Sequence, residues 1–227
     1  MAVRKGEVLM TEQTVRNPDW RAAHGFLLVG LVAGTIYVPA LRGWPQFWLA
    51  PLAAYLSLVR LVPPLWASFA GWRFGRVTGI ALVAAATIAA VSCGALLVFQ
   101  AIAQPDLHAY AKLFPHDPWG GIWLWGVGFA VVNALIEEIV FRGILFDAVE
   151  SQLGGWGAVL VTATLFGLGH LGGYPPGISG AILAGIYGLA LGGLRLWTGG
   201  IGLTFAAHIV ADATIFMIVV QSGVLAK

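Results

Sequence analysis

Charged side chains are scarce in this sequence. Only 10% of its 227 residues are Asp, Glu, Lys or Arg, whereas a soluble domain carries about 25%. With 59% hydrophobic residues and a mean hydropathy of +0.87, the chain cannot cover a globule with polar groups, so lipid must solvate much of its surface. The formal net charge of +2 is too small to indicate a nucleic-acid partner.

Cysteine is almost absent as well. Cys93 is the single cysteine and lies in an apolar run. A lone thiol excludes an internal disulfide and a CxxC metal site, and it gives no information on the redox compartment.

Long apolar runs are what the sequence has in abundance. Seven stretches approach the roughly 20 residues that a helix needs to cross the hydrocarbon core of a bilayer. We therefore predict an all-α fold, a polytopic transmembrane helical bundle of seven or eight spans that forms a single integral membrane domain over residues 1–227. The predicted spans are 24–41, 44–62, 77–103, 121–147, 156–172, 178–196 and 200–222.

Two segments between these runs are less regular. The segment 63–74 is apolar but short and starts with two prolines, so it could form an interfacial helix or half of an eighth span. Residues 104–120 carry prolines near both ends and are predicted to form the one substantial loop.

Lys and Arg are distributed unequally between the two sides of the predicted bundle. One side collects Arg4, Lys5, Arg16, Arg21, Arg60, Arg73, Arg76, Arg142 and Arg195, and the other only Arg42, Lys112 and Lys227. Since cytoplasmic loops carry the excess of positive charge, we predict a multi-pass protein of the cell membrane (inner or plasma membrane) with residues 1–23 in the cytoplasm.

Glycine recurs at the four-residue spacing of packed membrane helices. The pairs Gly30/Gly34 and Gly188/Gly192 are examples. We interpret both pairs as close helix contacts, because small residues at this spacing let two backbones approach each other.

Ionisable residues inside the spans are few and concentrated in the second half of the chain. Each costs about 2.5–3.5 kcal/mol at a helix centre on insertion scales, so their presence needs a reason. Glu137, Glu138 and Arg142 lie in the fourth predicted span, His170 in the fifth, and His208 with Asp212 in the seventh. At about 1.5 Å of rise per residue, Glu137, His170, His208 and Asp212 fall within one or two turns of the same depth.

Two of these residues have a local partner. Glu138 and Arg142 stand one helical turn apart and can form an ion pair, which fits a structural role as well as a catalytic one. Glu137 points about 100° away from Glu138 around the helix and needs partners from other helices. Two histidines, a glutamate and an aspartate at one depth indicate a hydrated reaction site.

The order and spacing of these residues resemble a known family, the glutamate-type intramembrane proteases of the CAAX-protease and bacteriocin-processing (Abi) group. Its motifs EExxxR, FxxxH and HxxxN/D match Glu137-Glu138-xxx-Arg142, Phe166-xxx-His170 and His208-xxx-Asp212. The resemblance covers roughly residues 121–216, so the catalytic core helices are predicted within 121–222.

The resemblance implies a role for each position and a metal-independent reaction. Glu137 would activate a water with the help of His170, and His208 with Asp212 would lie where the oxyanion forms. Glu138, Arg142 and Phe166 would support them. Many relatives carry Asn where this chain has Asp212, and an ionised aspartate has no proton to donate. The implied substrate is a membrane-embedded or lipid-anchored protein or peptide.

Three alternatives stay open. The same two histidines and two carboxylates could bind zinc in a metal-dependent protease, although the chain has no HExxH motif. Ser179 in a GxSG sequence could be the nucleophile of a rhomboid-like protease, although a packing role for this small residue is simpler. Finally, the buried charges could belong to a membrane immunity or binding protein without catalytic activity.

Overall fold

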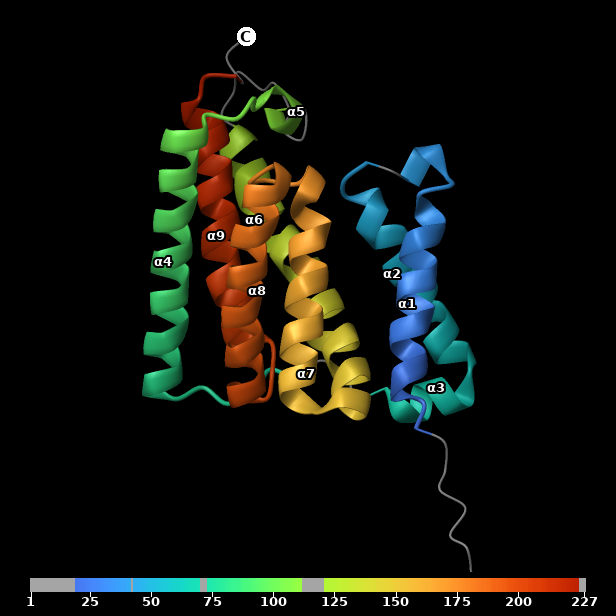
Figure 1. Ribbon diagram of the computed structural model, residues 1–227. Coiled ribbons are helices and arrows are strands. Elements are labelled where there is room, and N and C mark those ends of the chain that lie inside the picture. The colour runs from blue at the N-terminus through green and yellow to red at the C-terminus, as the bar shows by residue number, and fades with distance from the viewer. Residues whose placement is uncertain (1–18, 42, 70–72, 112–120, 225–227) are drawn as a thin grey trace, which may run out of the picture.

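The computed structural model describes residues 19–41, 43–69, 73–111 and 121–224, and all regular elements within these residues are helical. The predicted all-α class is therefore confirmed. Four helical stretches are long and apolar enough to cross a membrane, as expected for a membrane bundle: Gly79–Ala103, Gly121–Gly172, Gly177–Thr198 and Gly202–Gln221. Figure 1 shows these long helices side by side, with the first three helices grouped against one flank.

The two N-terminal helices are shorter than predicted. Helix α1 (Arg21–Thr35) has 15 residues and α2 (Gln46–Leu61) has 16. At 1.5 Å per residue they extend about 22–24 Å, less than the ~30 Å of a hydrocarbon core. The predicted span 24–41 thus ends in a 3₁₀ turn, η1 (Pro39–Leu41). The predicted span 44–62 begins in the turn that precedes α2.

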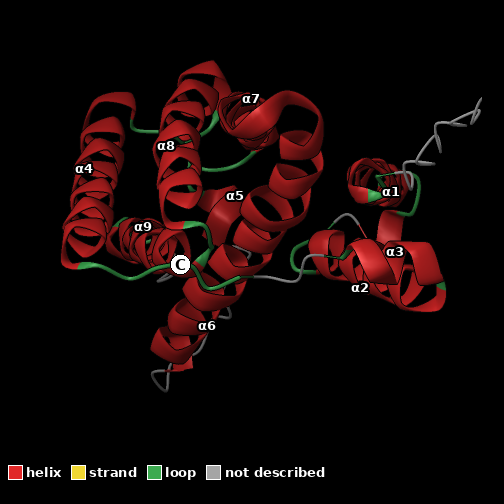
Figure 2. Ribbon diagram, turned by 90° about the horizontal axis from the view of Figure 1, so that it is seen from below, coloured by secondary structure: helices red, strands yellow, loops and turns green. Residues whose placement is uncertain are grey.

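The segment 63–74 forms only a short helix. Helix α3 (Pro63–Ser68) has six residues, and no further helix occurs in the part of this segment that is described. A full eighth span is thus not found there. Figure 2, seen along the bundle, places α1, α2 and α3 together beside α6 and α7 and away from α4.

Helix α4 (Gly79–Ala103) matches the third predicted span. Its first turn is capped by Thr78, whose hydroxyl accepts a hydrogen bond from the Ala81 N–H at 3.2 Å. The helix packs along α8 and α9. The predicted loop 104–120 contains the short helix α5 (His108–Ala111), and residues 112–120 lie outside the described part of the chain.

The longest helical stretch supplies two of the predicted spans. Helix α6 (Gly121–Glu137) continues into a π-helical segment, η2 (Glu138–Leu145), and then into α7 (Phe146–Gly169). At Gly154 the backbone takes φ +73° and ψ 175°, a conformation that L side chains rarely adopt, and the chain turns back (Figure 1). The predicted boundary between spans 121–147 and 156–172 coincides with this turn.

Helices α8 (Gly177–Thr198) and α9 (Gly202–Gln221) complete the bundle, and a 3₁₀ turn, η3 (His170–Gly172), precedes α8. The glycine prediction holds for α8. A Cβ atom on Gly188 would lie 3.0 Å from Cα of Ala163, and one on Gly192 would lie 3.2 Å from Cγ1 of Val159. The prediction is wrong for Gly30 and Gly34. A Cβ atom on either glycine would meet no atom within 4 Å, and both residues are exposed.

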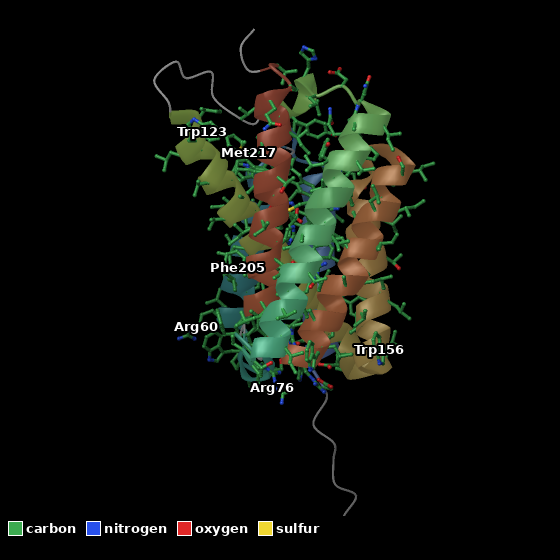
Figure 3. The ribbon with its side chains drawn as sticks, turned by 90° about the vertical axis from the view of Figure 1, so that its left-hand side faces the viewer. Arg60, Arg76, Trp123, Trp156, Phe205 and Met217 are labelled. Carbon is green, nitrogen blue, oxygen red and sulfur yellow. The ribbon has the colours of Figure 1, made fainter. Side chains whose placement is uncertain are left out.

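Two of the arginines counted as loop charges are buried. Arg142 and Arg195 expose only 1% and 6% of their surface. The Nε–H of Arg195 donates to the carbonyl oxygen of Arg142 at 2.9 Å, and its terminal nitrogen pairs with Asp147 at 2.8 Å. These two cations therefore do not contribute to the charge of a loop, whereas Arg60 and Arg76 lie at one end of the bundle (Figure 3). Six of the Lys and Arg residues in the charge count lie outside the described residues: Arg4, Lys5, Arg16, Arg42, Lys112 and Lys227.

Candidate active site

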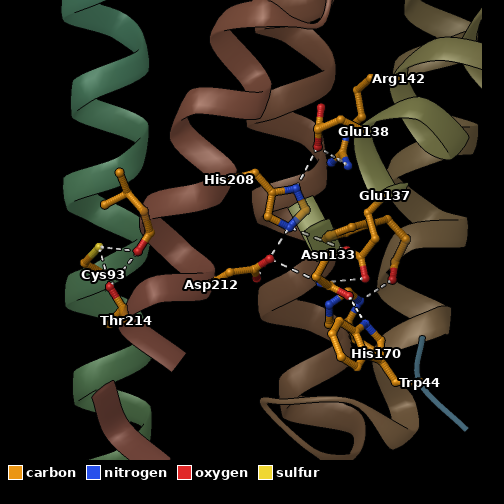
Figure 4. Close-up of polar contacts among 12 residues, drawn as sticks. Trp44, Cys93, Asn133, Glu137, Glu138, Arg142, His170, His208, Asp212 and Thr214 are labelled. Carbon is orange, nitrogen blue, oxygen red and sulfur yellow. Dashed lines mark hydrogen bonds and ion pairs between the residues drawn. The ribbon is translucent and has the colours of Figure 1, made fainter. Parts of the chain in front are cut away.

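His208 lies at the centre of the buried ionisable residues. Its Nδ1 atom is 2.8 Å from Oε1 of Glu138, and its Nε2 atom is 3.5 Å from Oε2 of Glu137. The same Nε2 atom is 3.8 Å from Oδ1 of Asp212, one turn further along α9. The structure thus brings together three of the four predicted catalytic residues, from α6 and α9 (Figure 4).

The predicted ion pair between Glu138 and Arg142 is confirmed. A guanidinium nitrogen of Arg142 lies 3.0 Å from Oε1 of Glu138, and the two side chains expose 1% and 0% of their surface. The guanidinium also lies over the ring of Phe166, 4.4 Å from its centroid. Both charges are therefore compensated inside the protein, as buried charges must be.

This ion pair determines how His208 is oriented. A carboxylate paired with arginine can only accept hydrogen bonds, so the His208 Nδ1–H donates to Glu138. The Nε2 atom then faces Glu137 and Asp212 (Figure 4). In the neutral ring this nitrogen is an acceptor, and in the imidazolium it is a second donor.

Glu137 has one free oxygen. Its Oε1 atom accepts a hydrogen bond from the amide of Asn133 at 3.2 Å. Its Oε2 atom is buried and has no hydrogen-bond partner within the described residues; Nε2 of His208 lies 3.5 Å from it. A buried carboxylate oxygen without a partner is suited to accept a proton from a bound molecule.

Asn133 and Trp44 belong to this cluster, and neither was identified from the sequence. The Asn133 amide donates to Asp212 at 3.2 Å as well as to Glu137, and its oxygen accepts the indole N–H of Trp44 at 3.0 Å. Asn133 could have been found, because it is a polar residue in an apolar span and lies one turn before Glu137. Trp44 gave no such signal, since a tryptophan near a span end is typical of interfacial anchors.

His170 and Phe166 form a second part of the site. The His170 Nδ1 atom lies 2.8 Å from the Phe166 carbonyl oxygen, and the two rings are 4.4 Å apart. Since a carbonyl can only accept, Nδ1 carries the proton and Nε2 presents a lone pair. His170 makes no direct hydrogen bond to Glu137 in the described structure.

A cavity connects the two parts. It has a volume of about 250 Å³ and is lined by side chains of α4, α7, α8 and α9, among them Phe166, His170, Tyr187, His208 and Asp212. Glu137 does not line it and is adjacent to it through His208. The cavity thus joins His170 to His208 and Asp212, and Glu137 lies behind His208.

The rest of the cavity wall is mostly apolar and extends to the outer surface of the bundle. Val91 of α4 and Ile186 of α8 line it and are 67% and 59% exposed. Tyr174, just beyond η3, also lines it; burial raises the pKa of this phenol to about 12, and the hydroxyl donates to Gln100 at 2.9 Å. The site thus opens towards the lipid-facing side of α4 and α8.

The alternative sites lie elsewhere. Ser179 is exposed at the start of α8 and does not line the cavity. Cys93 contacts Thr214 at 3.0 Å, away from the His208 cluster (Figure 4). Among the described residues, no group of three or more His, Cys, Asp and Glu side chains is arranged to hold a metal ion.

Comparison with known proteins agrees with the motif resemblance. A domain described as type II CAAX prenyl endopeptidase Rce1-like is found at residues 119–214, which contain all three motifs. No curated protein and no solved structure matched the chain. The matched region resembles a CAAX protease, and the four apolar helical stretches agree with a multi-pass membrane protein.

Proposed function

We propose that this chain, whose residues 119–214 form an Rce1-like CAAX endopeptidase domain, hydrolyses peptide bonds by a water that Glu137 activates inside the bundle. The observation that carries the proposal is the free Oε2 atom of Glu137. It is buried, lacks a hydrogen-bond partner within the described residues and lies 3.5 Å from Nε2 of His208.

The first step is the attack of water. Glu137 accepts a proton from the water while the water oxygen bonds to the peptide carbonyl carbon. His170 holds the same water through Nε2, whose lone pair is available because Nδ1–H is engaged by the Phe166 carbonyl.

The second step is the collapse of the tetrahedral intermediate. The carbonyl oxygen carries the negative charge and is stabilised by the imidazolium form of His208, which donates from Nε2. The C–N bond then breaks, and Glu137 returns the proton to the leaving amine. In this site, Asp212 orients His208 and supports its positive charge at a distance of 3.8 Å.

The charged residues around His208 keep it in place during both steps. Glu138 accepts a hydrogen bond from Nδ1 of His208, and Arg142 forms an ion pair with Glu138. Asn133 holds the carboxylates of Glu137 and Asp212 at 3.2 Å each. Positioning of this kind lowers the barrier because the reacting groups need no rearrangement at the moment of reaction.

The substrate in this proposal is a membrane-embedded or lipid-anchored protein or peptide. The cavity wall formed by α4 and α8 is mostly apolar, and it reaches side chains that face lipid. A hydrophobic segment can enter there without crossing water. We further propose that the reaction needs no metal ion and that residues 1–23 lie in the cytoplasm of a cell whose plasma or inner membrane holds the protein.

The test uses the purified protein in liposomes with two quenched fluorescent peptides of the same sequence, one with a prenylated CAAX end and one without. The proposal expects cleavage of at least one peptide at a single bond, found by mass spectrometry, and no cleavage by Glu137→Gln. Cleavage of neither peptide by the wild-type protein, or equal cleavage by the variant, contradicts the proposal.

A further inference from the structure

Tyr187 lines the cavity and carries a polar group that the proposed mechanism does not use. Its hydroxyl oxygen is buried and has no hydrogen-bond partner within the described residues. A buried tyrosine hydroxyl usually finds a partner, because leaving it without one costs free energy. The hydroxyl of Tyr110, by comparison, donates to the Gly173 carbonyl oxygen at 2.7 Å.

The ring of Tyr187 is held against two residues of the site. It lies edge-on to His208 with the ring centroids 5.7 Å apart, and it is tilted against Phe166 at 6.4 Å. All three side chains line the same cavity. The phenol is therefore fixed beside the imidazole that is expected to face the substrate carbonyl.

The other donors around His208 are engaged or lie away from the cavity. The Asn133 amide is shared between Glu137 and Asp212. Arg142 pairs with Glu138 through one nitrogen, and its Nε and second terminal nitrogen have no partner within the described residues, but Arg142 does not line the cavity. Asp212, in the position where an amide would be a donor, has no proton to give when it is ionised.

We propose that Tyr187 is a further catalytic residue, whose hydroxyl donates a hydrogen bond to the oxygen of the scissile carbonyl as it becomes an oxyanion. This inference rests on the proposed function, since it assigns a second donor beside His208 in the same hydrolysis. The O–H bond of Tyr187 stays intact throughout, and no proton or electron is transferred to or from the phenol.

The test replaces Tyr187 by Phe, which removes the hydroxyl and keeps the ring between His208 and Phe166. Loss of one oxyanion donor lowers kcat by about 100- to 1,000-fold in other hydrolases. We therefore expect kcat of Tyr187→Phe to fall by a similar factor, with little change in KM. Tyr110→Phe is the matched control, because it removes a tyrosine hydroxyl outside the cavity, and it should keep wild-type kcat.

A second measurement separates a catalytic role from a structural one. The affinity of a peptide phosphonate, which resembles the tetrahedral intermediate, should fall in Tyr187→Phe by the same factor as kcat/KM, while the thermal midpoint stays at the wild-type value. A rate within about threefold of wild type overturns the inference, as does a loss of rate matched by a loss of thermal stability.

Glu137→Gln, assayed in the same series, distinguishes the two proposals. If Glu137→Gln is inactive and Tyr187→Phe is fully active, only the role of Tyr187 is wrong. If Glu137→Gln is as active as wild type, the proposed function fails, and the role of Tyr187 fails with it.

Discussion

The Nδ1 atom of His208 lies 2.8 Å from Oε1 of Glu138, although the two residues are 70 positions apart in the sequence. This bond joins α9 to the π-helical segment and fixes which ring nitrogen faces Glu137. Because Glu138 is also paired with Arg142, the orientation of the histidine depends on an ion pair that does not line the cavity.

Removing Arg142 should therefore reduce stability and activity together. In Arg142→Met the carboxylate of Glu138 loses its cation in a fully buried position, and the loss of one member of a buried pair typically costs about 3–5 kcal/mol. Chemical or thermal unfolding in detergent micelles measures this change.

The double variant Glu138→Gln/Arg142→Met provides the control. It leaves no uncompensated charge, so it should recover much of the stability that Arg142→Met alone loses. Stability losses that simply add up would show that the two side chains do not interact in the folded protein.

Asn133 is expected to be a positioning residue. In Asn133→Leu the carboxylates of Glu137 and Asp212 lose their shared donor, and misplacement of reacting groups by about 1 Å can cost about 100-fold in rate. We expect kcat to fall by about 10- to 100-fold with KM nearly unchanged, together with a changed pH dependence of kcat.

Trp44→Phe tests the same network from its outer end. It removes the indole N–H that donates to Asn133 and keeps an aromatic ring beside Phe129, so it should cost about 1 kcal/mol of stability and change the rate less than Asn133→Leu does. A rate for Asn133→Leu equal to that of wild type would remove Asn133 from the site.

Only part of the site could be predicted from the sequence. The cluster of Glu137, His208 and Asp212 was predictable, because polar groups in apolar helices have few places to find partners. The π-helical segment was not, since the pattern of apolar and charged residues over eight positions does not separate i to i+4 from i to i+5 hydrogen bonding. Trp44 and Tyr187 were missed for a related reason: an aromatic residue in a membrane helix is ordinary until its neighbours are known.

The fold shows the same division. The turn at Gly154 was predicted from the break between two apolar runs, and the packing of Gly188 from its spacing. The short lengths of α1 and α2 were not predicted. The apolar run continues past Thr35, and hydropathy alone does not indicate where helical hydrogen bonding ends. The burial of Arg142 and Arg195 depends on partners from other helices, which a loop-by-loop count of charges cannot include.

The contact between α7 and α8 should be sensitive to a single methyl group. A Cβ on Gly167 would lie 2.7 Å from the Ala181 carbonyl oxygen, so Gly167→Ala must push the two helices apart. Helix α7 leads directly into His170 of η3, and α8 carries Tyr187. Overpacking of this kind costs about 1–3 kcal/mol. We expect lower stability and a lower rate, measured by unfolding in micelles and by peptide cleavage.

Gly193→Ala is the matched control, since a Cβ there meets no atom within 4 Å. It should keep wild-type activity and gain or retain stability, because alanine favours a helix over glycine by up to about 1 kcal/mol. Equal effects of the two substitutions would contradict the role assigned to close packing of α7 on α8.

Metal chelation separates the proposed mechanism from the zinc alternative. Dialysis against EDTA and 1,10-phenanthroline should leave the cleavage rate unchanged, and metal analysis of the active protein should find less than one zinc per chain. A rate that falls on chelation and returns with added Zn²⁺ would establish a metal-dependent reaction at the same residues.

The most direct measurement of the central claim is kcat of Glu137→Gln in liposomes, set against Glu150→Gln as a control. Glu150 lies on α7 outside the His208 cluster and loses its charge in the same way. Because general acid–base catalysis contributes about 100- to 10,000-fold, the account expects Glu137→Gln to lose at least about 100-fold in kcat while Glu150→Gln keeps the wild-type value. A correctly folded Glu137→Gln protein that cleaves the peptide at the wild-type rate would contradict it.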